Sequence, residues 1–307
     1  MYTQHQLELL EKVENLKKEE GLSQNAVGQL IGVSGATLSQ IKNGNYNADP
    51  QKIFKTLENY FEIKEKAKLT YSELNYAPTS ISEQICDIIA ICHAKGGLSI
   101  VTGEAGIGKT KAISKYVADH PTNSFTITMN PCFTGVKTLL SIIAEKIGCE
   151  CSHSIAQLYN SIKNKLSDGM ILIIDEAQHM TLKDIDVVRS FSDYFASINQ
   201  TFGICFVGNP ETVYKMGAKK AGFSQITNRA KQTKIYSTLD VQRSDIEKLF
   251  PILADKNMNA EIDFLYHIAQ TPQALRGAVN LFSNAYDHEN ITYEGLVAMA
   301  KFMEMEV

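Results

Sequence analysis

The chain has 307 residues, a length that favours two domains. Its 44% hydrophobic and 21% charged residues are ordinary for a folded globular protein and exclude wholesale disorder. With 30 basic and 34 acidic residues the formal net charge is -4, which argues against a protein that coats nucleic acid through bulk charge but leaves room for a local basic patch. Four of the basic residues are arginines, the side chains best suited to planar phosphate recognition, and they stand at positions 189, 229, 243 and 276.

The sequence predicts a cytoplasmic protein with reduced thiols. Its first residues lack the charged start and apolar stretch of a signal peptide. The longest apolar stretches, such as 85–92, are far shorter than the roughly 20 residues that a membrane helix needs. Six cysteines do not make a disulfide framework in a chain of this length. The run Cys149-x-Cys151-x-His153 lacks the second half of a zinc site, so we expect ordinary buried or loop cysteines there.

Residues 1–65 are predicted to be helical, because their apolar residues recur at the spacing of a helix face. Within them, an apolar helix, a glycine turn and Val33-Ser34 before a second short helix are typical of a helix-turn-helix. Ser34 would cap the second helix, and Leu38 and Ile41 would face inward. A helical hairpin for protein contact is the alternative, and nine acids against seven lysines disfavour tight DNA binding by this part alone. The residues available for groove or phosphate contacts would be Gly35, Thr37, Ser39, Gln40 and Lys42.

The rest of the chain is predicted to hold an α/β domain followed by a small helical one. A polar stretch over 66–80, ending in Pro78-Thr79-Ser80, indicates a linker. Short apolar strands then alternate with helical patterns, which predicts a parallel sheet with both faces covered over 81–240. From 241 to 307 the pattern is helical again. The predicted strands are 98–101, 125–129, 170–174 and 204–207, and the predicted helices between them begin after Lys109 and cover 136–147.

The strongest motif is Gly103-Glu104-Ala105-Gly106-Ile107-Gly108-Lys109-Thr110, a complete phosphate-binding loop between a predicted strand and a predicted helix. Its glycines let backbone N–H groups curl around phosphate oxygens, and the helix that follows aims its positive end at the same oxygens. Lys109 would reach the β- and γ-phosphates, and the Thr110 hydroxyl would ligate Mg²⁺. We expect the loop, together with Lys111, to bind ATP.

Acidic and amide side chains end two later strands. Asp175 and Glu176 follow the strand at 170–174, and Asn209 follows the strand at 204–207. Ligands of α/β proteins bind at the carboxyl ends of the strands, so these side chains are expected to meet the phosphate-binding loop. Asp175 would hold Mg²⁺ and Glu176 would polarise the attacking water. Asn209 would orient that water, although an ordinary Asn-Pro turn is the alternative.

These motifs together resemble the AAA+ ATPase family, whose members hydrolyse ATP. The resemblance implies that Asn209 is the polar strand-tip residue called sensor 1. It also implies that Arg276, within Thr271-Pro-Gln-Ala-Leu-Arg276, is the sensor 2 arginine that contacts the γ-phosphate of its own subunit. Arg229 lies where that family carries the finger that completes a neighbouring subunit's site, and a solvated surface arginine is the alternative. The arginines without such context, interpreted as surface or packing residues, are Arg189 and Arg243.

DNA contacts in the α/β domain are expected from lysines rather than arginines. In AAA+ proteins that wrap DNA, loops after the second strand line the duplex, and this resemblance points to Thr134, Lys137, Lys163 and Lys165. Residues 212–239 contain six basic side chains and no acid, which indicates either a solvated face or a surface near a subunit interface or a DNA channel.

The order of helix-turn-helix, linker, ATPase domain and short helical C-terminal part resembles the Mu B family of ATP-dependent target-DNA-capture proteins. The likeness extends over nearly the whole chain and includes Asp175-Glu176-Ala177-x-His179 and Ala274-Leu275-Arg276. It implies a phage or mobile-element protein of a bacterial host that forms ATP-dependent filaments on double-stranded DNA and delivers that DNA to a transposase, whose contact stimulates hydrolysis and release. The alternatives are a replication initiator or helicase loader, and a helix-turn-helix regulator that only senses nucleotide.

Overall fold

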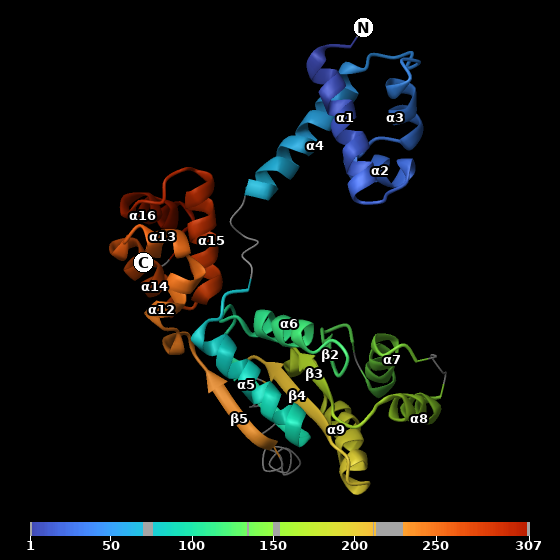
Figure 1. Cartoon of the computed structure of the whole chain (residues 1–307), viewed down its shortest axis with the longest axis vertical. Coiled ribbons are helices and arrows are strands. Elements are labelled where there is room, and N and C mark those ends of the chain that lie inside the picture. The colour runs from blue at the N-terminus through green and yellow to red at the C-terminus, as the bar shows by residue number, and fades with distance from the viewer. Residues whose placement is uncertain are drawn as a thin grey trace. The chain divides into compact units, whose positions relative to one another are not determined.

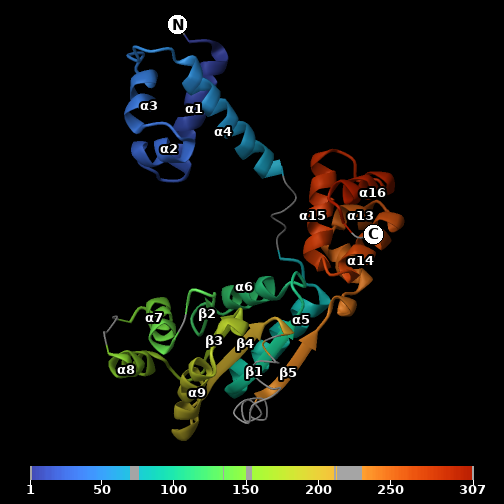
Figure 2. The same ribbon diagram turned by 180° about the vertical axis from the view of Figure 1, so that it is seen from behind.

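The computed structural model describes residues 2–69, 76–133, 135–149, 154–210, 212 and 230–305. The chain divides into two compact units, Met1–Thr70 and Tyr71–Val307. In its described residues, the first unit contains helices joined by loops and no strand. The second unit contains a sheet and a helical bundle (Figures 1 and 2). Nowhere in the described part of the chain is a helix both long and apolar enough to span a bilayer.

The first unit packs four helices around one small core (Figure 1). Ser23 and Ser34 cap the two helices of the turn by accepting backbone N–H bonds from Ala26 and Thr37. Leu38 and Ile41 are buried against neighbouring helices, as the sequence predicted. The helices are α1 (Gln4–Glu19), α2 (Gln24–Ile31), α3 (Gly35–Lys42) and α4 (Gln51–Leu69).

Glycines set the close approach of α2 and α3. A Cβ on Gly28 would lie 2.8 Å from the backbone nitrogen of Gly35. Gly35 itself is buried against Asn25, so the expectation that it is available to DNA is wrong. Residues 66–69, expected in the linker, continue α4, and the next helix begins at Ser80.

The second unit is built on a five-stranded sheet in the order β2-β3-β4-β1-β5. Every neighbouring pair is parallel, so all carboxyl ends lie along the same edge. β3 and β4 are buried on both faces, which explains their nearly continuous apolar sequences. The strands are β1 (Gly97–Gly103), β2 (Ser124–Thr128), β3 (Met170–Asp175), β4 (Phe202–Gly208) and β5 (Ala230–Tyr236).

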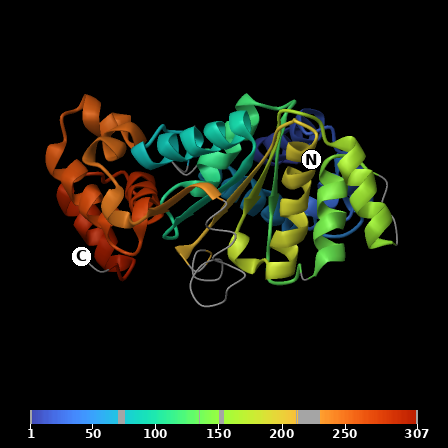
Figure 3. The same ribbon diagram turned by 90° about the horizontal axis from the view of Figure 1, so that it is seen from below.

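Helices cover both faces of the sheet (Figure 3). Alternate residues along each central strand enter different cores: Ile173 packs with one set of helices, and Leu172 and Ile174 pack with the other. The first set is α5 (Ser80–Lys95) and α6 (Lys109–Asp119), and the second is α7 (Val136–Lys146), α8 (Ile155–Lys165) and α9 (Leu182–Ser197). Short 3-10 turns follow β3 (η1, Ala177–His179) and β5 (η2, Thr238–Asp240).

The C-terminal helices form a bundle that shares the core of the α5 face. Phe250 and Phe282 meet inside it with ring centroids 4.6 Å apart. We call this bundle the lid. The predicted fold, a parallel α/β domain with helical parts on either side in sequence, is confirmed. The lid helices are α12 (Arg243–Leu249), α13 (Pro251–Asp255), α14 (Asn259–Gln270), α15 (Ala274–Asp287) and α16 (Tyr293–Phe302).

A buried histidine fastens α5 to the rest of the domain. The two ring nitrogens of His93 lie 2.9 Å from the Tyr116 hydroxyl of α6 and 2.9 Å from the carbonyl oxygen of Gly169, just before β3. Burial lowers the pKa of His93 below its ordinary value of 6.5, which keeps the ring neutral in the folded protein.

We therefore expect His93 to make the fold sensitive to acid. The stability that depends on neutral His93 is present above the unfolded pKa and is lost as the pH falls through the lower folded pKa. Replacing His93 with Gln should reduce the fall in thermal midpoint between pH 7 and pH 5, measured by circular dichroism. The exposed His288 provides the matched control, because His288→Gln should retain the wild-type fall. An undiminished fall in the His93→Gln protein would contradict the assignment.

Candidate functional site

The phosphate-binding loop joins the end of β1 to the start of α6. Gly106 and Gly108 have φ values of 82° and 99°, a region that favours glycine. Between them, the fully buried Ile107 fixes the loop in the core. The Lys109 ammonium donates hydrogen bonds to the carbonyl oxygens of Gly103 and Glu104, at 2.7 and 2.8 Å. Backbone, helix end and ammonium thus form one cationic cradle of the kind that binds phosphate.

Across the sheet edge, Asp175 from the end of β3 meets Thr110 from α6. The Thr110 hydroxyl donates a 2.8 Å hydrogen bond to Asp175 Oδ2, and the backbone N–H of Glu176 donates to Asp175 Oδ1 at 2.9 Å. A hydroxyl and a carboxylate are hard oxygen donors, which suit Mg²⁺ shared with a bound phosphate. The pair predicted to hold the metal is therefore brought together.

Burial shifts both charged groups of this site toward their neutral forms. It raises the pKa of Asp175, a shift opposed by the bonds from Thr110 and the Glu176 N–H. Burial also lowers the pKa of Lys109, and the carboxylates of Glu176 and Asp175 oppose that shift. A buried carboxylate is stabilised by a bound cation and a buried ammonium by a bound anion, so a metal–phosphate ligand suits both.

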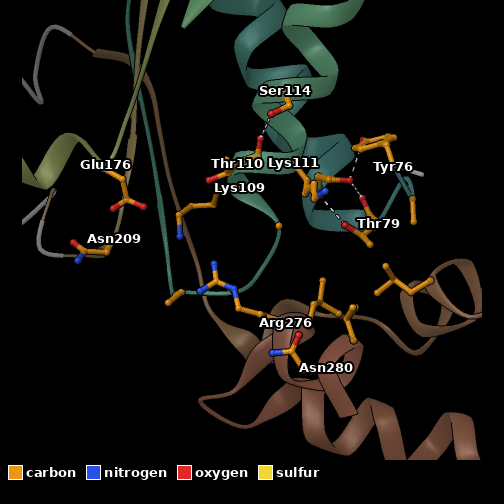
Figure 4. Close-up of a pocket in the computed structure, with 18 residues that line it drawn as sticks. Tyr76, Thr79, Lys109, Thr110, Lys111, Ser114, Glu176, Asn209, Arg276 and Asn280 are labelled. Carbon is orange, nitrogen blue, oxygen red and sulfur yellow. Dashed lines mark hydrogen bonds between the residues drawn. The ribbon is translucent and has the colours of Figure 1, made fainter. Parts of the chain in front are cut away.

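Glu176 directly follows β3 and has a left-handed backbone conformation, with φ 55°. That conformation costs an L-residue roughly 1–2 kcal/mol. Asn209, at the end of β4, lies beside it (Figure 4). The side-chain Oδ1 of Asn209 is buried and has no hydrogen-bond partner among the described residues. A buried acceptor without a protein partner is suited to accepting a hydrogen bond from a water molecule.

The lid reaches the phosphate-binding loop through its backbone. The Arg276 N–H donates a 3.1 Å hydrogen bond to the Gly106 carbonyl, and a Cβ on Gly106 would lie 3.1 Å from the Cβ atoms of Ala274 and Arg276. Ala274, which opens α15, is buried with φ 55°. The Arg276 side chain points from α15 toward Lys109 (Figure 4). Arg276 is thus positioned to approach a phosphate held by the loop.

These residues surround a cavity of about 700 Å³ (Figure 4). One end carries the charged groups Lys109, Glu176 and Arg276. The other end is more apolar and includes an aromatic ring, which suits a nucleoside. Its lining includes Tyr76, Ala77, Leu249, Leu275 and Val279.

The structure thus places most of the predicted nucleotide residues around one cavity. Gly106, Ala105, Gly108 and Lys111 line it directly. Glu104 turns away instead, because its carboxylate accepts a 2.7 Å bond from the Thr238 N–H. Arg229 and Thr134 lie outside the described residues, as do Cys151 and His153.

Two arginines lie away from the cavity. Arg243 bonds Asp263, Glu247 and Asn259 within the lid. Arg189 pairs with Asp186 and Asp193 on α9.

The predicted DNA-contact residues are distributed over several elements. Lys137 is exposed at the start of α7, near the carboxyl edge of the sheet. Lys163 and Lys165 lie instead at the end of α8, directly before β3. The Lys163 ammonium sits 4.9 Å from the centroid of the Tyr194 ring, which gives it a packing role within the domain.

In the helix-turn-helix unit, two of the four candidate side chains have internal partners. The Thr37 hydroxyl lies 2.7 Å from the Ser34 hydroxyl, and Lys42 forms a 2.8 Å ion pair with Glu14. Gln40 is exposed and Ser39 half-buried on α3. The exposed surface of this helix therefore offers mostly uncharged groups.

Sequence reasoning missed several residues of the site. Tyr76, Thr79 and Ser82 come from the region interpreted as a linker and from the start of α5. Gln178 is buried and bonds Glu176 and Asn209, which both line the cavity. The available signal was its place two residues after Glu176, at the edge where the strand ends converge.

Two family descriptions match separate parts of the chain. Residues 93–216 match the AAA domain, and residues 13–73 match a helix-turn-helix. The chain therefore has a helix-turn-helix domain followed in sequence by an AAA-type ATPase domain, as the sequence predicted.

Two relatives match most of the chain and have related names. The chain is 25% identical over 250 residues to the ATP-dependent target DNA activator B of Escherichia phage Mu, covering 80% of this chain and 77% of the relative. It is 26% identical over 220 residues to the Mu-like prophage FluMu DNA transposition protein B of Haemophilus influenzae, covering 70% and 73%. The resemblance to the Mu B family is confirmed.

Solved structures share the fold at low identity. The ORC2 protein of Aeropyrum pernix superposes with a TM-score of 0.56 at 12% identity, over 76% of this chain and 70% of that one. The Cdc6p protein of Pyrobaculum aerophilum gives a TM-score of 0.56 at 15% identity, over the same shares. This likeness establishes the fold alone.

The cradle geometry predicts which lysine on α6 matters. Replacing Lys109 with Ala should weaken ATP binding at least about tenfold, because the ammonium supplies a charge-assisted contact to phosphate. Lys115→Ala, which removes an exposed lysine paired with Asp119 on the same helix, should leave binding within about twofold. Calorimetric titration of ATP into each protein would measure both. Equal affinities for wild type and Lys109→Ala would contradict the assignment.

Proposed function

We propose that this protein captures double-stranded DNA when ATP is bound and delivers it to a transposase. The observation that supports this most directly is that Lys109, Thr110 and Glu176 line one cavity, with Asp175 bonded to Thr110 behind it. The chain's relatives include a protein named a target DNA activator. Nucleotide would then control when the protein holds DNA.

The charged and polar residues at the phosphate end of the site have separate tasks in the proposed hydrolysis of ATP. The loop N–H groups and Lys109 bind the phosphates, and Thr110 and Asp175 hold Mg²⁺, which when bound neutralises charge on the phosphate oxygens. Glu176 accepts a proton from the attacking water, and Asn209 orients that water through its Oδ1. Arg276 stabilises negative charge on the γ-phosphate from the lid of the same subunit.

Assembly would explain how an acidic chain holds DNA. A formal net charge of -4 is unfavourable for a single subunit on a polyanion. A filament would repeat a modest basic patch on every subunit, so that weak contacts add through multivalency. Arg229 would complete the site of each neighbour and tie hydrolysis to assembly. Exposed groups such as Lys137, Lys165 and Gln40 are the contact candidates, and binding would be sequence-tolerant and sensitive to salt.

Transposase contact would then stimulate hydrolysis and release the DNA.

A replication initiator or helicase loader is the alternative function, but the sequence identity to the solved structures described above is at most 15%. The transposition relatives are 25% and 26% identical to this chain, which favours the first proposal.

The proposal is tested by imaging the full chain on double-stranded DNA while phosphate release is measured. With ATP we expect continuous assemblies that dissolve as the salt concentration rises, and with no nucleotide we expect bare DNA. Glu176→Gln should still assemble but lose at least about 100-fold in turnover, because the proton acceptor is gone. Lys109→Ala should neither assemble on DNA nor hydrolyse ATP.

Arg229→Ala tests the shared site, since its assemblies should form on DNA and hydrolyse ATP slowly. Normal turnover within such assemblies would exclude the finger role. DNA binding that ignores nucleotide in the wild type would contradict the proposal and favour a regulator that only senses ATP.

A further inference from the structure

The side-chain amide of Gln178 links Glu176, which follows β3, to Asn209, which follows β4. Its Nε2 donates a hydrogen bond to Glu176 Oε2, and its Oε1 accepts from the backbone N–H of Asn209 at 3.2 Å. The same Oε1 lies 3.4 Å from the Thr212 hydroxyl. We propose that Gln178 is a positioning residue that sets the orientation of the Glu176 carboxylate according to the state of the β4 tip.

The two ends of a glutamine amide make this link directional. An amide offers a donor at nitrogen and an acceptor at oxygen, and here each is matched to the group it faces. Glutamate in its place would present a second carboxylate to Glu176, and methionine would offer neither a donor nor a comparable acceptor. The function of the link therefore depends on the chemistry of the side chain as well as on its size.

Burial makes the link rigid. Gln178 is 5% exposed and Thr212 is fully buried, so water does not compete readily for their bonds. Gly208 provides the space: a Cβ there would lie 2.6 Å from Gln178 Oε1 and would also overlap the Thr212 hydroxyl. Gly208 does not have positive φ, so its close neighbours rather than its backbone conformation exclude alanine.

Gln178 acts through Glu176 because it does not line the cavity itself. A side-chain amide does not ionise at neutral pH, so it takes no acid or base role. Holding one carboxylate oxygen fixes the direction in which the other faces the attacking water, and a displaced reacting group costs up to about 100-fold in rate. The bonds to the amide oxygen also make the rate depend on the positions of Asn209 and Thr212.

The inference rests on the proposed ATPase function and predicts a defect in turnover rather than in binding. In the full chain on saturating DNA, Gln178→Met should lower kcat by about 10- to 100-fold, the usual effect of removing a group that orients a reactive one. Its affinity for ATP should stay within about twofold, because Lys109 and Thr110 keep their contacts. Gln178→Glu, which retains the acceptor and loses the donor, should also lose at least about tenfold in kcat.

Two further variants separate positioning from simple packing. Thr212→Val keeps the volume but removes one bond to the amide oxygen, and it should lower kcat several-fold with unchanged ATP affinity. Gln200→Met, at an exposed position after α9, is the matched control and should behave as wild type. ATP binding by calorimetry confirms that each variant has a folded site.

The outcomes distinguish the two proposals. If wild type hydrolyses ATP, Glu176→Gln does not, and Gln178→Met and Gln178→Glu both turn over within twofold of wild type, the positioning role is wrong while the ATPase function stands. Equal losses of kcat and ATP affinity in both variants would also overturn it, because they indicate a structural role. No turnover by wild type would reject the proposed function and this inference together.

Discussion

The strand order β3-β4-β1 is the constraint on which the site depends. Because these three strands are parallel neighbours, their carboxyl ends stand in a row, and the acid pair, Asn209 and the phosphate-binding loop follow in that order. β4 occupies the space between the loop and the acids, and its tip is therefore next to both. Thr110 closes the gap by reaching Asp175 across 2.8 Å, so one hydrogen bond joins segments 65 positions apart in sequence.

The lid also contacts the elements at the carboxyl edge of the sheet. It touches the loop through the bond from the Arg276 N–H to Gly106, and it holds the start of α5 through Asp245, whose Oδ1 accepts bonds from the Ser80 N–H and hydroxyl at 2.6 and 2.8 Å. Asp245 is fully buried, so these contacts are shielded from water. The start of α5 and the phosphate-binding loop are therefore both bonded to the lid. The left-handed residues Glu176 and Ala274 both fall at this site, where backbone strain is held by surrounding packing.

The sequence allowed the fold class and the phosphate end of the site to be predicted because both depend on local patterns. A strand, a glycine loop and a helix in succession define the cradle, and an apolar strand that ends in Asp175-Glu176 defines its partner. The roles of Gln178, Tyr76 and Gly35 could not be predicted, because each follows from which chain segments meet in space. Lys163 illustrates the same limit: its charge indicated DNA, whereas its place over Tyr194 follows from how α8 packs on α9. The apolar end of the cavity combines residues from the expected linker, α12 and α15, and no spacing in the sequence relates them.

We propose that the ends of β1 and β3 form one metal–nucleotide site. Electron paramagnetic resonance of Mn²⁺, added with a non-hydrolysable ATP analogue, tests it most directly. We expect one tight Mn²⁺ per chain, bound only when the nucleotide is present. This Mn²⁺ should be lost in Asp175→Asn and retained in Asp186→Asn, whose carboxyl is exposed on α9. Tight, nucleotide-dependent Mn²⁺ binding by Asp175→Asn, equal to that of wild type, would contradict it.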